Sequence, residues 1–519
     1  MQSEIKTHST NSVQVCQNCK KDFTIEPEDF SFYEKIKVPP PTFCPICRYK
    51  RRIIWRNVRH LFRGKDAITG KEIFTGISPE VNCPVYELSY WNSDIWDGLD
   101  YGKDYDFTKP FFKQLHELFY IVPFPSKSMQ RCVNSDYSNQ CDDMKNTYLC
   151  FNAVNMQDSA YCVNGGNLKK CFDLTSCYGD ELCYESVRVD KSYKTIGSIM
   201  SESCVDVYFS KNCVGCTDCF GCVNQRHSKY KIFNKQYTRE EYFEKLASFK
   251  LDTWEGFSKA QKISEDFWLK FPIKYMLGYR NCREIEYCLN SRRINNCFAC
   301  VGLKDKKYCI LNKQYSKEKY YKMIEKIKEH MNEMPFTDKK GNFYKYGEYF
   351  PIEFSPFAYN ETIINDEFPL NKEEAEKLGF VWRDFNRRKY ESTIIVSSIP
   401  ESILEVNENI IKETIECLGC KKAYRITLDE LQFLKTLNLP IPRYCVDCRF
   451  TRRQNFMVPP LLKDGSCMCS GEYSLNGIYK NTQIHDVHGK EKCLNIFKTA
   501  YDIDKEIIYC EKCYQQEVY

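Results

Sequence analysis

The chain has 519 residues, 43% of them apolar, which is enough for roughly three domains with cores of their own. It carries 75 Lys and Arg against 70 Asp and Glu, and a net charge of +5 does not by itself indicate a nucleic-acid-binding protein. The polar first residues do not contain the apolar segment of a signal peptide, and no apolar run approaches the ~20 residues that cross a membrane. We therefore expect a cytoplasmic protein without membrane contact, in which the 31 Cys are reduced.

After a tail that we expect to be disordered (1–15), two CxxC motifs separated by 24 residues predict a zinc ribbon at 16–63. The same spacing returns 401 residues later and predicts a second ribbon at 413–463. Acidic residues and later prolines predict a helix between the two motifs of each copy. The expected ligands are Cys16, Cys19, Cys44, Cys47, Cys417, Cys420, Cys445 and Cys448. Eight unrelated buried cysteines would not explain this repeated spacing.

Residues 64–131 are rich in aromatic and acidic side chains and include a predicted helix at 110–121. The clustered acids either bind a cation or a sugar or, as in most such loops, are solvated and cap their neighbours. Short matches relate this stretch to the C-terminus, but Glu87 and Tyr90 stand where the later copy has Cys510 and Cys513. We expect this module to be free of metal and to be held by aromatic packing.

Residues 132–309 contain 17 of the 31 Cys, and all of these lie at intervals that are multiples of three. Period three matches neither an α-helix nor a β-strand, but it fits a narrow β-solenoid that turns a small residue inward at every third position. The alternative is a set of zinc knuckles, because Cys213, Cys216, Cys219 and Cys222 form a CxxCxxCxxC run. We favour inward stacking, since the spacing extends far beyond that run.

The segments 230–246 and 308–324 resemble each other at an offset of 78, and each contains NKQY before a predicted helix. Thr238 and Ser316 are expected to cap these helices. We infer two copies of a unit made of a cysteine ladder, NKQY and a helix that covers the exposed edge. The predicted boundaries are 132–250 for the first solenoid segment and 251–334 for the second.

Residues 335–412 are expected to form a connector and a linker, with a short helix that begins after Asn371. Residues 464–519 predict a third zinc module. Its expected ligands are Cys493, Cys510, Cys513 and one of Cys467 and Cys469, with His488 as a further candidate. The predicted fold class is mainly β with short helices (α+β), in which two zinc-ribbon modules flank a central cysteine-ladder β-solenoid with helical caps.

The chain resembles, over nearly its whole length, an uncharacterised bacterial family of cysteine-rich, twin-zinc-ribbon proteins from small-genome lineages. The segments that carry the resemblance are CPICRYKRR with Arg56-Asn57, WNSDIWDGLDYGKDYDF (91–107), CFGCVN (219–224), IFNKQY (232–237), YGEYFP (346–351), SPFAYNET (355–362) and YCEKCYQQEVY (509–519). The resemblance implies this architecture and brings no activity with it.

We interpret the protein as a zinc-stabilised, non-catalytic binding or scaffold protein with about three zinc ions. Arginines follow the second CxxC of each ribbon, and their forked guanidinium groups suit phosphate. The candidate contacts to RNA or a ribonucleoprotein are Arg48, Arg51, Arg52, Arg56, Arg449, Arg452 and Arg453. The alternative for each arginine is an ion pair that merely fixes the module, for example with the acidic loop at 94–106. A protein partner is equally compatible with this reading.

Two other classes of function stay open. An enzyme with a solenoid-borne or Cys-based site is one, although the sequence has no Gly-rich phosphate loop, no HExxH, no GxSxG and only 7 His. Metal storage or redox sensing by the cysteine ladder is the other. The ladder also places Ser, Thr, Ala and Leu at the same phase as Cys, which favours packing over metal storage.

Overall fold

The computed structural model describes residues 12–274, 287–291, 295–385, 390–457 and 461–518, and it shows a mixed α/β chain with many short strands in several small sheets. Residues 12–15 were predicted to belong to a disordered tail. They form strand β1 (Ser12–Val15), which pairs with β2 (Asp22–Ile25), so that part of the prediction is wrong. The rest of the tail and Cys282 lie outside the described residues. Among the described helices, none is long and apolar enough to cross a membrane.

The chain divides into two compact units, and each unit is built from two separate stretches of sequence. Unit 1 comprises residues 1–128 and 280–384, and unit 2 comprises residues 129–279 and 385–519. Each unit therefore takes one predicted ribbon from an end of the chain and one cysteine ladder from its middle. The segments that we expected to follow one another as separate domains are interleaved.

Unit 1 begins with the first ribbon, a β-hairpin followed by two helices. Its N-terminal stretch contains β1, β2, α1 (Pro27–Ile36), α2 (Pro45–Ile53), β3 (Phe62–Lys65), β4 (Glu72–Thr75), β5 (Val85–Tyr86), α3 (Leu88–Asn92), α4 (Phe111–Ile121) and β6 (Phe124–Pro125). Its second stretch contains β17 (Asn295–Phe298), β18 (Lys307–Ile310), β19 (Lys313–Gln314), α7 (Lys317–Glu333), β20 (Phe336–Thr337), β21 (Phe343–Tyr344), α8 (Ile363–Glu367) and α9 (Lys372–Lys377). The predicted N-caps Ser316 and Asn371 precede α7 and α9.

Unit 2 begins with the longer ladder and ends with the second ribbon and the C-terminal module. Its first stretch contains β7 (Met129–Gln130), β8 (Asn139–Tyr148), β9 (Phe151–Ala160), β10 (Val163–Lys169), β11 (Tyr193–Ile196), β12 (Val205–Tyr208), β13 (Thr217–Phe220), β14 (Lys229–Ile232), β15 (Lys235–Gln236), α5 (Arg239–Ser248), α6 (Trp254–Trp268) and β16 (Pro272–Lys274). Its second stretch contains β22 (Ile415–Glu416), β23 (Ala423–Tyr424), α10 (Leu428–Leu437), α11 (Val446–Gln454), β24 (Lys463–Ser466), β25 (Ile496–Thr499), β26 (Ile507–Tyr509) and α12 (Glu511–Val518).

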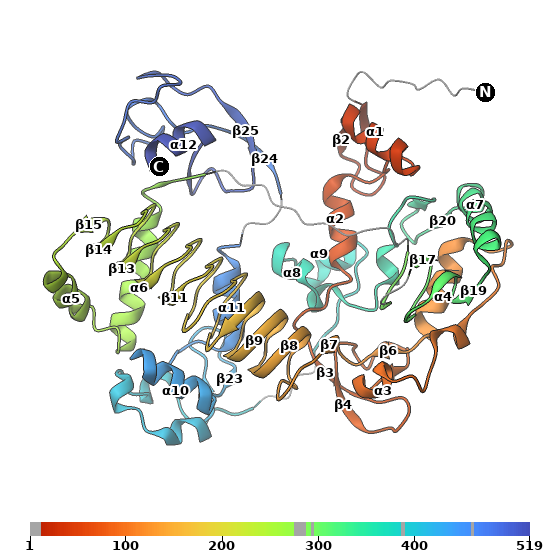
Figure 1. Cartoon of the computed structure of the whole chain (residues 1–519), viewed down its shortest axis with the longest axis horizontal. Helices are drawn as coiled ribbons and strands as arrows, with labels where there is room; N and C mark the ends of the chain where they lie inside the picture. The colour runs from red at the N-terminus through yellow and green to blue at the C-terminus, as the bar shows by residue number, and fades with distance from the viewer. Residues whose placement is uncertain (1–11, 275–286, 292–294, 386–389, 458–460, 519) are drawn as a thin grey trace. The chain divides into compact units, whose positions relative to one another are not determined.

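The first ladder, residues 129–232, keeps one register throughout. The paired residues lie in parallel with the residue twelve positions later, as in Cys141↔Ala153 and Val207↔Cys219. Isolated bridges such as Ala160↔Phe172 continue the same offset between the named strands, and Figure 1 shows these short strands side by side. The second ladder, in unit 1, has the same offset at Cys297↔Cys309. Twelve residues are four steps of the three-residue period.

The three-residue period has a backbone cause. Every third residue from Gln140 to Phe233 has a positive φ, between 45° and 79°. Asn, Asp and Gly occupy 16 of these 32 positions, and they are the residues that adopt this left-handed conformation at least cost. The residue that follows each of them belongs to the phase of the ladder cysteines. Of the twelve Cys between 132 and 222, eleven are buried and Cys132 is half-buried.

Inward thiols and hydroxyls make the same hydrogen bonds. The Sγ of Cys162 donates to the carbonyl of Ala160, two residues back, and to that of Cys171, nine residues on. The hydroxyl of Ser186 repeats this pattern with Tyr184 and Thr195. Cys and Ser are interchangeable at this phase because both are small and both satisfy buried carbonyls.

The NKQY motif ends each ladder. Asn234 accepts a hydrogen bond from the backbone N–H of Val223 at 2.8 Å and donates to its carbonyl at 3.0 Å. Asn312 makes the same two bonds with Val301. In both copies the asparagine therefore satisfies backbone groups of the last coil that would otherwise lose their partner in the ladder.

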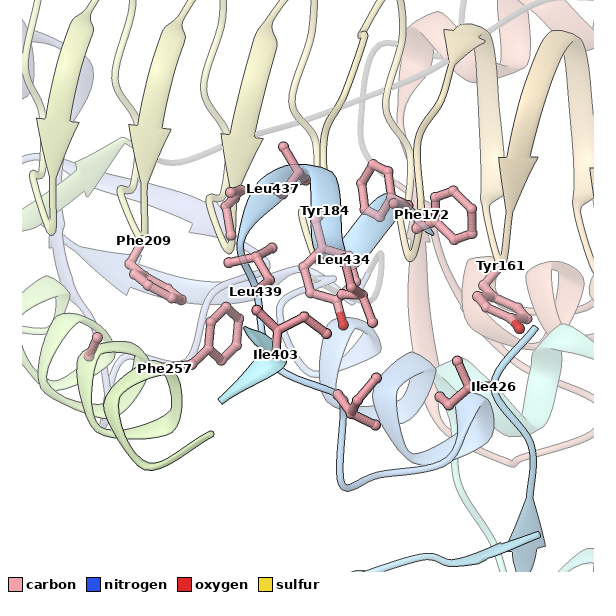
Figure 2. Packing of buried hydrophobic residues seen from close by; sticks show 14 of the residues in the cluster. Tyr161, Phe172, Tyr184, Phe209, Phe257, Ile403, Ile426, Leu434, Leu437 and Leu439 are labelled. Atoms are coloured by element: carbon pink, nitrogen blue, oxygen red, sulfur yellow. The ribbon is translucent and has the colours of Figure 1, made fainter. Parts of the chain in front are cut away.

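The main core of unit 2 lies along one side of the first ladder. Figure 2 shows Tyr161, Phe172, Tyr184 and Phe209 pointing from the ladder toward apolar residues of α10 and α6. Phe172 stacks on Phe433 with 4.4 Å between ring centroids. The second ribbon is thus attached to the ladder through α10, the helix that Thr427 caps.

Candidate metal centres

The two ribbons hold their cysteines in the same local structure. The first CxxC lies in the turn of a β-hairpin, where Lys20 and Lys421 adopt a positive φ. The second CxxC opens a helix, so that Cys44 and Cys445 precede the first residues of α2 and α11. A helix N-terminus favours a thiolate over a thiol. The hairpin and the helix therefore present four sulfurs to one point.

The distances between these sulfurs suit a metal ion. Each set of four lies within 4.8 Å, and the Sγ atoms of Cys19 and Cys44 are 3.7 Å apart. In the second ribbon, Cys417–Cys448 and Cys420–Cys445 are separated by 3.7 and 3.6 Å. Tetrahedral zinc with Zn–S bonds of about 2.3 Å requires sulfurs about 3.8 Å apart, whereas a disulfide bond measures about 2.0 Å.

The grouping of thiols changes their acidity. A hydrogen bond from Cys47 lowers the pKa of the Cys44 thiol to about 5. A hydrogen bond from Cys513 likewise lowers the pKa of the Cys469 thiol to about 5, although burial opposes this shift. The same contacts raise the pKa of the donors Cys47 and Cys513, so within each pair one sulfur is favoured as the thiolate and the other as the thiol.

The C-terminal module contains a third group, formed by Cys467, Cys493, Cys510 and Cys513. Cys467 follows β24, and Cys510 and Cys513 lie at the start of α12. The Sγ atoms of Cys493 and Cys510 are 3.9 Å apart, and Cys467 accepts the backbone N–H of Cys510 at 3.2 Å. The sequence left Cys467 and Cys469 as alternatives, and the structure brings Cys467 into this group.

A fourth group consists of Cys469, His485, His488 and Cys513. The Nδ1 of His485 is 3.3 Å from the Sγ of Cys469 and 3.2 Å from the Nε2 of His488. The Nε2 of His488 is 3.1 Å from the Sγ of Cys513. Cys513 thus belongs to both C-terminal groups. Sequence reasoning treated His488 as a spare ligand and gave His485 no role.

The corresponding module of unit 1 shows what replaces the third group. The hairpin β3–β4 has the same register as β24–β25, and by this register Asp66 stands at the position of Cys467 and Thr69 at that of Cys493. Asp66 accepts hydrogen bonds from the backbone N–H of Glu87 at 2.9 Å and from Thr69 at 2.6 and 2.7 Å. Burial opposes ionisation, but these bonds hold the pKa of Asp66 below its usual value.

Aromatic packing completes this module, as we expected. Tyr86 contacts Tyr90 and Trp96 edge to face, with 5.1 and 5.6 Å between the ring centroids. Tyr90 stands at the position of Cys513. Hydrogen bonds to one carboxylate and an aromatic cluster therefore occupy the place of the sulfur group.

The candidate arginines of the second ribbon form ion pairs with acidic residues elsewhere in unit 2. Arg453 and Arg449 are buried and form ion pairs with Asp173 at 2.8 and 3.3 Å, and Arg449 also pairs with Glu430 at 2.9 Å. Arg452 is half-buried and pairs with Glu185 and Glu265. These contacts join α11 to the first ladder, and the acids are not those of the loop at 94–106.

The arginines of the first ribbon divide into two sets. Arg51 is buried, pairs with Glu348 at 3.0 Å and lies over the ring of Phe43. Arg48 is half-buried and donates to the hydroxyl of Tyr33. Arg52 and Arg56 are exposed. Of the four candidate arginines at this ribbon, Arg52 and Arg56 are therefore the two that are exposed.

The run from Cys213 to Cys222 is not among the groups that the described residues bring within metal-binding distance. Cys213, Cys216, Cys219 and Cys222 are all buried in the ladder. The Sγ of Cys219, for example, donates to the carbonyls of Thr217 and Ser228. The inward cysteines thus use their hydrogen-bonding capacity on the backbone.

The sequence did contain a signal for the second C-terminal group of ligands. Seven Cys and His residues fall within 464–519, three more than a single tetrahedral ion takes. The β3–β4 connection spans 66–71, whereas the β24–β25 connection spans 467–495 and contains Cys469, His485 and His488. The extra residues therefore bring a second ligand set with them.

Comparisons of the chain with family models, with curated proteins and with solved structures give no match.

Proposed function

We propose that the protein is a zinc-stabilised, non-catalytic scaffold whose ribbons and C-terminal module are fixed by zinc. The observation that carries this proposal is the set of Cys and His groups with ligand atoms within 4.8 Å of one another. Sulfur and imidazole donors at tetrahedral distances are the ligands of structural zinc. Such ions supply folding energy directly, so each module depends on its metal.

The ladders are the second part of this proposal. We infer that the constant twelve-residue register winds each ladder into a β-solenoid with four three-residue sides to a turn. A parallel stack of this kind gives a rigid surface along which neighbouring residues repeat at strand spacing. Ribbon 2 is anchored on that stack by α10 and by the ion pairs of Arg449 and Arg453.

Unit 1 contains a cavity whose lining suits a binding role. It measures about 800 Å³, and its walls include Pro39, Pro40, Phe343 and Tyr346. Its one carboxylate, Glu348, is already engaged by Arg51 and by Thr42. The residues that line this cavity include no Cys, His or Ser, and the hydroxyl of Thr42 donates to Glu348.

For the partner, we propose that RNA or a ribonucleoprotein contacts the first ribbon through Arg52 and Arg56. Both are exposed on or beside α2, while Arg51 and the arginines of the second ribbon are committed to ion pairs. Crosslinking in cells tests this contact. Charge reversal of Arg52 and Arg56 should abolish RNA crosslinks to residues 48–63, whereas reversal of the exposed Arg131 and Arg239 should not. Crosslinks that survive the first change would refute the contact.

Metal content tests the scaffold itself. Native mass spectrometry of the full chain should show zinc, and Cys420→Ser should remove one ion because it takes one of four ligands from the second ribbon. Cys219→Ser is the matched control. It should keep the metal content unchanged, since a hydroxyl replaces the thiol donor inside the ladder. A chain without bound zinc, or an equal loss in both variants, would contradict the proposal.

A further inference from the structure

The two C-terminal groups share one sulfur, and we propose that they hold a dinuclear zinc centre in which the thiolate of Cys513 bridges both ions. This inference rests on the proposed function and extends it. The first ion would take Cys467, Cys493, Cys510 and Cys513, and the second Cys469, His485, His488 and Cys513. The chain would then hold four metal ions, one for each group, and not the three expected from the sequence.

The distances in the second group fit an ion of its own. Tetrahedral zinc with Zn–N and Zn–S bonds of about 2.1 and 2.3 Å places nitrogen and sulfur ligands about 3.5 Å apart. The separations between neighbouring ligand atoms, from Cys469 through His485 and His488 to Cys513, are 3.3, 3.2 and 3.1 Å. These atoms converge on one point although three of the residues, Cys469, His485 and His488, lie in the long β24–β25 connection.

The surroundings of His485 point the same way. Its side chain is fully buried, and its Nε2 is 2.8 Å from the carboxylate of Glu517, which is also buried. A carboxylate on the far nitrogen is the usual support of a metal-bound histidine, because it fixes the tautomer and turns the other nitrogen toward the ion. Here that other nitrogen is Nδ1, the atom that faces Cys469 and His488.

The sulfur of Cys469 also has supporting contacts, because two N–H groups donate hydrogen bonds to it. It accepts the backbone N–H of Gly471 at 3.4 Å and the side-chain amide of Asn481 at 3.1 Å. Asn481 is itself held by the hydroxyl of Tyr509, which donates to its Oδ1 at 2.6 Å. Donors directed at a buried sulfur stabilise a thiolate ligand. The second group therefore has supporting contacts that a coincidental cluster would lack.

The comparison with unit 1 supports a coupled pair of ions. In that module Asp66, Thr69, Glu87 and Tyr90 replace the first group, and the short β3–β4 connection contains no counterpart of the loop that carries His485 and His488. Tyr90 takes the position of Cys513, which belongs to both groups. Without that sulfur, neither ion would have a complete set of ligands. Both groups are present in one module and both are absent from the other.

Cobalt provides a probe that separates a bridged pair from isolated sites. Full-length protein loaded with Co²⁺ alone should bind four ions, and the thiolate bridge should couple two of them antiferromagnetically. The low-temperature electron paramagnetic resonance signal should therefore integrate to only two high-spin ions. Three bound ions, or four ions that all contribute to the signal, would overturn the proposal.

Two variants with the same metal content make the result specific. His488→Ala should lose the second ion of the centre, so that three cobalt ions remain and all three give a signal. Cys420→Ser should also retain three, but only one should give a signal because the bridged pair is intact. Equal signals from the two variants would contradict the bridge. A failure of the scaffold proposal would be seen separately: the Cys420→Ser variant would then bind as many metal ions as the wild type.

Discussion

Arg453 and Asp173 form an ion pair with 2.8 Å between Nη1 and Oδ1, and neither side chain is more than 1% exposed. Arg453 follows the second CxxC of ribbon 2, and Asp173 lies in the first ladder. A residue type that suggested phosphate binding in the sequence therefore joins a ribbon to a ladder within unit 2. Arg449 reaches the same carboxylate at 3.3 Å, so one buried acid serves two arginines.

Removal of the Asp173 charge should be costly. We expect Asp173→Asn to lower the free energy of unfolding by about 3–5 kcal/mol, because two buried guanidinium groups each lose one of their counter-charges. Urea denaturation followed by circular dichroism measures this change. Asp143→Asn is the control: Asp143 has the same left-handed backbone and pairs with Arg131, but at the surface, so loss of its charge should destabilise the protein much less. Equal effects would show that burial of the pair is unimportant.

Asp180 predicts a pH dependence. Burial raises the pKa of this inward-facing carboxyl to about 8, while its Oδ1 accepts the backbone N–H of Ser192 at 2.8 Å. Because the folded pKa lies above the unfolded value of about 3.8, the contribution of the neutral carboxyl to stability is complete at low pH. That contribution is lost as the pH rises from about 4 to 8.

Asp180→Asn keeps the acceptor and removes the titration. We expect the variant to be more stable than the wild type above pH 8, by an amount on the order of a few kcal/mol, and the difference to shrink toward pH 4. Denaturation of both proteins across this range measures the difference, and the metal sites cancel because both proteins contain them. A difference that does not vary with pH would show that Asp180 is ionised in the folded state.

Two ladder glycines separate backbone strain from packing. Gly179 and Gly197 both have a positive φ, but a Cβ on Gly197 would lie 2.5 Å from the ring of Phe209, whereas the nearest atom to one on Gly179 is 3.6 Å away. Gly179→Ala should cost about 1 kcal/mol from its left-handed conformation alone. Gly197→Ala should cost about 1–3 kcal/mol more, because the buried ring must shift. Thermal denaturation of the two variants measures the difference. Equal melting temperatures would refute this account.

The β3–β4 module of unit 1 should accept a metal ion after substitution. Asp66→Cys, Thr69→Cys, Glu87→Cys and Tyr90→Cys in combination recreate the first C-terminal group on a hairpin of the same register. We expect native mass spectrometry to show one additional zinc ion, and Asp66→Cys alone to add none. If the combined variant binds no more zinc than the wild type, the two modules do not share the geometry that their register implies.

The sequence was most informative where spacing and local geometry decide the outcome. The CxxC spacing places the four sulfurs of each ribbon together because a hairpin turn and a helix start are rigid over four residues. The capping residues Thr238 and Ser316 predicted α5 and α7 for the same local reason. The three-residue period of the ladder was also predicted from the sequence. Its backbone cause was present there too, because Asn, Asp and Gly often precede the inward residues.

What the sequence could not supply depends on segments that are far apart in the chain. Nothing near Arg453 indicates that its partner lies 280 residues earlier. The helix α6 was not predicted, although Thr253 caps it, and its Phe257 packs on Phe209 of the ladder. The fourth group was missed because Cys513 is counted once in a sequence, whereas the structure places its sulfur among two sets of possible ligands.

The interleaving of the two units has a consequence for synthesis on the ribosome. The first ribbon emerges early, but its core combines Phe112 and Leu115 with Ile310 and Ile327, which are made about two hundred residues later. Unit 1 is complete only when residue 384 has been added. By then the first ladder of unit 2 has already left the ribosome. Domains generally fold as units during translation, and here the earliest segment must wait. The nascent chain therefore carries an unfinished aromatic surface for most of its elongation, and chaperones have that interval in which to bind it.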